Sequence, residues 1–416
     1  VKIVGAVSAD GFVFRLNLMA AVFGALSVWL FANLVSVSIR LAIDEHSQNR
    51  GRAAAAGVLA GVCAGLFLAF CMPFWYVSNR AHHAPFNVFL FLATVALLGR
   101  YVASSRPAVL YLAAFLYGIG MVEFATMIVF LPLIVLGLIV LWLYREWFDV
   151  RVAIIAAACG VAGLMLYFVE AAFFFGSVGY ELKSYTGFFQ VVWLMWRDQV
   201  GLITHSLPQA GWLIVLIPTG VPWLTCLMLA RRALNRENDW TYTVLHIVIT
   251  ILAVGVMFNM KFAPWPMLGA GLLLVMPYLL VAAVFGYLAA YWYLLPSGWW
   301  EDSESRIAGL VRDRLGLVLA LVFLAAVMVP PFLHYGKVDA RGNDAVNRYA
   351  GEVILTLDKR GWLVTDVILD DVLLVAAKER GKQVKLLNYR AGNSELYMRY
   401  VGTLFDAVRL RNLAGI

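Results

Sequence analysis

Ionisable residues interrupt the long apolar segments of this 416-residue sequence at only a few places. The turn SNRAHHAP contains Arg80, His82 and His83, and single carboxylates stand at Glu123 and Glu170 in otherwise apolar surroundings. Because an ionisable group at membrane depth is costly unless it is paired or hydrated, such residues are the first candidates for function. Grouped cationic side chains suit a phosphate or pyrophosphate. A neighbouring carboxylate can orient a sugar or accept a proton.

Each candidate also has a plain structural interpretation. Adjacent histidines in a turn are more often solvated than functional, and a lysine such as Lys261 often only extends its ammonium to the membrane interface. Adjacent histidines also point apart, and no third ligand lies near them in the sequence, so we expect no metal site. The predicted catalytic residues are Glu123 and Glu170. The predicted phosphate-binding residues are Arg15, Arg80, His82, His83 and Lys261.

The composition requires a membrane around these residues. Hydrophobic residues make up 63% of the chain, charged residues make up 14%, and the mean hydropathy is +0.83. A water-soluble protein cannot bury that much apolar surface. Because one helical crossing needs roughly 20 apolar residues, we expect about ten transmembrane helices. They fall at about 16–42, 53–77, 86–104, 107–122, 124–144, 151–175, 211–231, 240–260, 266–295 and 315–335, with 107–144 open to either one broken helix or two short ones.

The arginines indicate the sidedness. The net charge of +7 comes from clusters in alternate connections, which is the positive-inside pattern and not a nucleic-acid surface. With those clusters in the cytoplasm, the N-terminal end and all of the candidate residues face the outside. The expected partners are membrane lipids. The sequence does not indicate an oligomeric state.

The predicted transmembrane domain, residues 1–335, includes an external segment at 176–210. Aromatic residues recur there at helical spacing, which predicts an amphipathic helix that either covers the bundle or serves as a lid over a substrate. Residues 336–416 have ordinary soluble composition and predict a small external α/β domain. Its expected elements are a helix at 343–357, a strand at 362–365, a helix at 369–380 ended by Gly381, and a strand at 384–387.

Several segments resemble bacterial relatives of the protein O-mannosyltransferases. Arg15-Leu16-Asn17-Leu18 followed by MAAVFGALSVWLF is similar to the family's second span, and PFWYVSNRAHHAPFNVFLFLATVALL to the external turn and helix that come next. YGIGMVEFATMIVFLP is similar to a later glycine-containing turn. The stretch from 349 to 388 is similar to the C-terminal unit.

This resemblance implies the inner membrane of a bacterium as the location. It also implies a GT-C-type fold: an all-α polytopic bundle that transfers sugar from a polyprenyl-phosphate carrier, with inversion at the anomeric carbon. The lipid-linked sugar is the donor, a protein or glycan is the acceptor, and no further cofactor is expected. The family's usual catalytic carboxylate lies in a loop before the second span, so we expect the first helix and that loop to lie outside this chain. His82 stands where relatives tend to have Glu, and Glu123-Phe124 where they tend to have Asn-His.

Two other functions remain open at this point. A transporter or flippase for a lipid-linked or small anionic substrate would place charges at the bilayer midplane, whereas the charges here lie near one face. A non-catalytic assembly subunit would use the external domain for docking.

Overall fold

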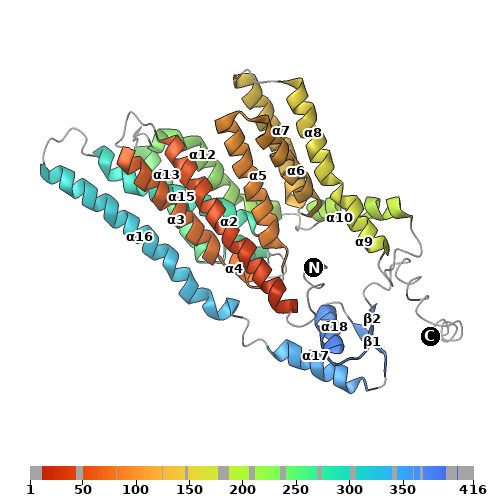
Figure 1. The fold of residues 1–416 in the computed structure, drawn as a ribbon. Helices are drawn as coiled ribbons and strands as arrows, with labels where there is room; N and C mark the ends of the chain where they lie inside the picture. Colours follow the sequence, from red (N-terminus) through yellow and green to blue (C-terminus); the bar gives the residue numbers. More distant parts are fainter. Residues whose placement is uncertain are drawn as a thin grey trace. The chain divides into compact units, whose positions relative to one another are not determined.

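The computed structural model describes residues 12–43, 50–80, 82–123, 125–145, 149–176, 187–205, 211–234, 240–268, 274–299, 306–339, 344–358, 360–365, 369–389 and 401. In this part of the chain, nine helices are long and apolar enough to cross a membrane, and the shorter apolar helix α6 accompanies them (Figure 1). The chain is therefore an integral membrane protein with an all-α polytopic bundle. The helices from the first described residue to Val338 are α2 (Phe12–Ala42), α3 (Arg50–Phe70), α4 (Met72–Ser78), α5 (Ala84–Ser104), α6 (Pro107–Glu123), α7 (Ala125–Arg145), α8 (Val150–Leu164), α9 (Leu166–Gly176), α10 (Phe188–His205), α11 (Gly211–Val215), the π-helical turn η2 (Leu216–Gly220), α12 (Val221–Leu234), α13 (Trp240–Met257), α14 (Pro264–Leu268), α15 (Met276–Trp299) and α16 (Arg306–Val338).

These helices correspond to the ten predicted spans, with differences at proline residues. The span expected at 53–77 ends at Phe70, and α4 begins beyond Cys71 with Pro73 in its first turn, where the missing N–H of proline costs nothing. The span expected at 266–295 begins instead at Met276, after the short helix α14. The region 107–144 holds two helices, α6 and α7, and not one broken helix.

Helix α3 is the centre of the main core. It packs against α2 on one side and α15 on the other, and its small residues allow both neighbours to come close. A Cβ built on Gly61 would lie 2.5 Å from the carbonyl oxygen of Ala32 in α2. A Cβ built on Gly286 of α15 would lie 2.5 Å from the carbonyl oxygen of Ala60. Close backbone contact of this kind is how membrane helices associate when lipid removes the hydrophobic driving force.

A second group of helices is formed by α5, α6, α7 and α8 (Figure 1). Helices α6 and α8 run parallel, and a Cβ on Gly118 would lie 2.1 Å from the carbonyl oxygen of Gly160. At one end of this group, the Trp142 indole donates to the Tyr101 hydroxyl at 2.9 Å. At the other end, the Tyr117 hydroxyl of α6 bonds to the Met127 carbonyl of α7.

Contacts divide the chain into two compact units, Val1–Met165 with Val200–Val338, and Leu166–Gln199 with Asp339–Ile416. Helix α10, whose residues 188–199 belong to the second unit, forms the amphipathic helix expected within 176–210. Val191 is buried and Phe188 packs near Phe168 of α9, whereas Phe189 and Trp193 are exposed. Whether this helix acts as a cover or a lid stays a prediction.

The C-terminal elements match their predictions closely. They are α17 (Asp344–Thr356), β1 (Trp362–Thr365), α18 (Asp370–Glu379) and β2 (Lys385–Asn388), and the two strands pair in parallel with Trp362 opposite Lys385. Gly381 has φ of 64°, a left-handed conformation that suits glycine at a helix end. Both helices and the inward side chains of the strands share a small core, formed by Ala350, Ile354, Leu357, Leu373, Ala376 and Ala377 with Leu363 and Leu386 beside them.

Candidate functional site

The turn between α4 and α5 carries three of the predicted phosphate-binding residues. The guanidinium carbon of Arg80 lies 3.3 Å from the centroid of the Tyr76 ring, which is a cation–π contact. The rings of His82 and His83 stack with centroids 4.4 Å apart. The turn is short because α5 begins directly after His83, and Pro85 in its first turn has the φ angle that favours a helix start.

Three buried polar atoms in and beside this turn lack hydrogen-bond partners among the described residues: Nη1 of Arg80, Oγ of Ser78 and Oδ1 of Asn87. Buried polar atoms are nearly always paired in folded proteins, so a group of unpaired ones points to a ligand that supplies the partners. Burial lowers the pKa of the Arg80 guanidinium from its ordinary value.

Glu123 is the predicted residue that the fold brings to this turn from farther along the chain. The side-chain amide of Asn87 in α5 donates to the backbone carbonyl of Glu123 at 3.3 Å, so the end of α6 lies beside the start of α5. The residue Glu123 is exposed. The end of α6 that carries this carboxylate is thus held beside the start of α5 by a contact between backbone and side chain that the sequence does not reveal.

His82 has an observable role in holding the turn. The backbone N–H of Ala84 donates to its Nδ1 at 3.0 Å, which requires that this nitrogen carry no proton. Burial, and then the charge of His83, lowers the pKa of His82 below its ordinary 6.5. The imidazole therefore serves the start of α5 in its neutral form.

The other predicted residues lie farther from this turn or in the other unit. Lys261 is exposed and lies in the turn between α13 and α14. In the same turn, the side-chain amide of Asn259 contacts the Met72 sulfur at 3.8 Å, which places this turn beside α4. Arg15 is half-buried in α2, nine residues before Gly24, or about 14 Å along the helix. A Cβ on Gly24 would lie 2.8 Å from Oγ of Ser78, so Arg15 lies toward the same end but beyond the turn. Glu170 lies in α9 of the second unit, half-buried.

Sequence reasoning missed four residues that the structure makes relevant. Ser78 and Asn87 contribute unpaired atoms, and Tyr76 supports Arg80. His334 in α16 is 5% exposed, and neither of its ring nitrogens has a partner in the part of the chain that the structure describes. A signal for Asn87 and His334 was present, since each is a polar residue inside an apolar helix. Where side chains are described, no three His, Cys, Asp or Glu residues gather as metal ligands.

Comparisons with known proteins bear on the first third of the chain. Searches with the whole chain find no matching curated protein and no matching solved structure. Residues 3–149 match the family model described as the protein O-mannosyl-transferase TMEM260 N-terminal domain. The matched region contains α2 to α7, and with them the α4–α5 turn and Glu123. This match relates the chain to the protein O-mannosyltransferases.

Proposed function

We propose that the protein is a membrane glycosyltransferase of the GT-C type, and that its α4–α5 turn binds the phosphate of a polyprenyl-phosphate-linked sugar. The sugar would pass to a protein or glycan acceptor on the external face of a bacterial inner membrane. The observation that carries the proposal is the buried Nη1 of Arg80, which lacks a hydrogen-bond partner among the described residues. The relation to protein O-mannosyltransferases supports a sugar as the transferred group.

A lipid-linked phosphate fits the surroundings of Arg80. The Tyr76 ring centroid lies 3.3 Å from the guanidinium carbon, and this contact restrains the Arg80 side chain. Its N–H groups can therefore meet a tetrahedral oxyanion with little loss of side-chain freedom. An anion would also favour the charged guanidinium, which burial disfavours. The Oγ of Ser78 is a further donor in the same region. A polyprenyl chain needs apolar helix surfaces beside the phosphate, and a membrane bundle offers them.

The proposed reaction is a displacement at the anomeric carbon. A carboxylate removes the proton of the acceptor hydroxyl as its oxygen bonds to that carbon. The bond from the carbon to the phosphate oxygen breaks, and the electron pair leaves with the lipid phosphate, which Arg80 stabilises. Glu123 is our candidate for the base or for orienting the acceptor. Glu170, His83, Lys261 and Arg15 remain candidates for contacts with the donor or acceptor.

The experiment is a transfer assay with the complete product of the reading frame in liposomes. Polyprenyl-phosphate carrying radiolabelled mannose is supplied with an unstructured Ser/Thr-rich peptide. We expect radiolabel on the peptide, and a loss of about 100-fold or more in Glu123→Gln if this residue is the base. Lipid-linked sugar that crosses the bilayer without transfer would instead support a transporter. No transfer and no movement would contradict the proposal.

A further inference from the structure

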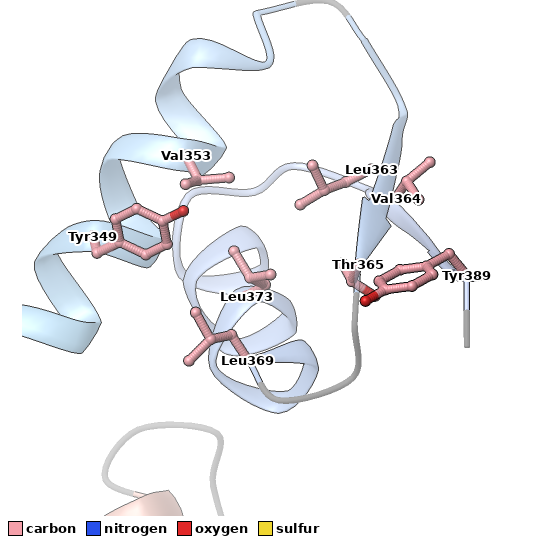
Figure 2. A pocket seen from close by; sticks show the side chains of 8 residues that line it. All are labelled: Tyr349, Val353, Leu363, Val364, Thr365, Leu369, Leu373 and Tyr389. Atoms are coloured by element: carbon pink, nitrogen blue, oxygen red, sulfur yellow. The ribbon is translucent and has the colours of Figure 1, made fainter. Parts of the chain in front are cut away.

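A cavity of about 360 Å³ opens among α17, β1 and α18 in the C-terminal elements (Figure 2). None of the side chains that line it is charged. It lies at the small end of ligand sites, which span about 300–1,000 Å³, and so suits one large side chain or one sugar ring. The lining residues are Tyr349, Val353, Leu363, Val364, Thr365, Leu369, Leu373 and Tyr389.

The lining combines aliphatic walls with hydroxyl groups. Leu369, the residue before α18, and Leu373 of α18 extend toward the space, with Val353 of α17 opposite (Figure 2). Tyr349 and Tyr389 are 55% and 62% exposed, so their rings border the opening and their hydroxyls can meet polar groups. These surroundings fit an uncharged ligand with a bulky apolar part.

One hydroxyl in this lining is unsatisfied. Oγ1 of Thr365 is buried and has no hydrogen-bond partner within the described residues. A ligand that enters the cavity with a donor or acceptor near its apolar part would pair with it. A polypeptide backbone always offers such groups beside each side chain.

Strand β1 adds a second means of binding. Three consecutive residues of β1, Leu363 to Thr365, line the cavity, and β2 pairs with only one edge of this strand. In the described part of the chain, no strand pairs with its other edge. A two-stranded sheet is marginal by itself, and an open edge readily accepts an extended peptide. Because side chains alternate along a strand, such a peptide would direct every second residue to the same face.

We propose that the cavity and the β1 edge together bind the acceptor polypeptide in an extended conformation, with one aromatic or large aliphatic side chain in the cavity. The inference rests on the proposed function, since it names the acceptor of that reaction. The donor does not fit, because its phosphate requires cationic groups that the lining lacks. A sugar ring fits less well than a peptide, because three hydroxyls cannot satisfy its many hydrogen-bonding groups.

The test measures peptide binding to the full chain without any transfer step. Two short fluorescent Ser/Thr peptides are used, one with Phe at its centre and one with Ala there. We expect the Phe peptide to bind more tightly by about fivefold or more, and Tyr349→Ala to remove that preference. Thr365→Val keeps the shape of the side chain and should weaken both peptides. The matched control is Leu355→Ala, which removes an exposed apolar side chain (60% exposed) from the same helix outside the cavity.

The outcomes separate this inference from the proposed function. Equal binding of the two peptides, or an unchanged preference in Tyr349→Ala, would overturn the cavity as a peptide site. Competition by methyl mannoside with no effect of the central Phe would assign it to carbohydrate and also overturn the inference. Peptide binding that depends on the cavity, together with failed sugar transfer, would keep the inference as a docking site and reject the proposed reaction.

Discussion

Replacement of Gly118 by alanine tests the close parallel packing of α6 on α8, which positions the end of α6. The added Cβ would lie 2.1 Å from the carbonyl oxygen of Gly160, and an ordinary contact of 3.4 Å exceeds that distance by 1.3 Å. The obstacle is backbone, so no side-chain rotation relieves it, and the helices must separate. Overpacking of this kind costs about 1–3 kcal/mol. We expect the upper part of that range.

The assay is unfolding of the purified protein in mixed micelles, followed by tryptophan fluorescence as the fraction of denaturing detergent rises. Gly137→Ala in α7 is the matched control, because a Cβ there meets nothing within 4 Å. We expect the control to be as stable as the wild type or slightly more so, since alanine favours helix. If Gly118→Ala unfolds at the same detergent fraction as the control, α6 and α8 do not pack as described.

Three further results are expected from local features of the fold. In α13, Nε2 of His246 lies 2.6 Å from the Tyr287 hydroxyl and forms a hydrogen bond with it. A double-mutant cycle of His246→Leu with Tyr287→Phe, measured by detergent unfolding, should therefore give a coupling energy of about 1 kcal/mol. Additive effects of the two substitutions would show that the bond contributes nothing. Because the pKa of His82 is lowered in the fold, the unfolded chain takes up a proton first as the pH falls below 6.5. The free energy of unfolding should therefore decline below pH 6.5, and it should decline less in His82→Gln. Unfolding curves at several pH values measure both. Gly381→Ala forces alanine to a φ of 64°, at a cost of about 1–2 kcal/mol. This loss of stability should raise the rate of amide hydrogen exchange across 369–388. An unchanged exchange rate would contradict the left-handed helix end.

The C-terminal elements were predictable because local signals agree there. Gly381 ends α18 where a left-handed residue is needed. The short β-rich runs predicted at 362–365 and 384–387 flank that helix and lie within one residue of β1 and β2. The spans were predictable from length and apolar composition alone. The break at Cys71 was not, because 53–77 is apolar throughout and only Pro73 indicates a new helix start.

The candidate site was predictable in its residue types but not in its contacts. Polar residues in apolar places identified Arg80 and Glu123. The contact between Asn87 and the end of α6 depends on how α5 packs on α6. That register is set by the fit of many side chains, which no spacing in the sequence records. The same holds for Ser78, whose unpaired hydroxyl matters only because the fold buries it. The function of the other predicted residues stays a prediction.

The most direct test of the central claim is the affinity of the full chain for polyprenyl phosphate without a sugar, which requires no catalytic step. Arg80→Gln removes the guanidinium and its charge-assisted hydrogen bonds, which are worth about 1.5–3 kcal/mol. We expect its dissociation constant to rise by about 10- to 100-fold. The control Arg106→Gln changes an exposed arginine in the α5–α6 turn and should leave the affinity unchanged. Equal affinity of wild type and Arg80→Gln would contradict the account.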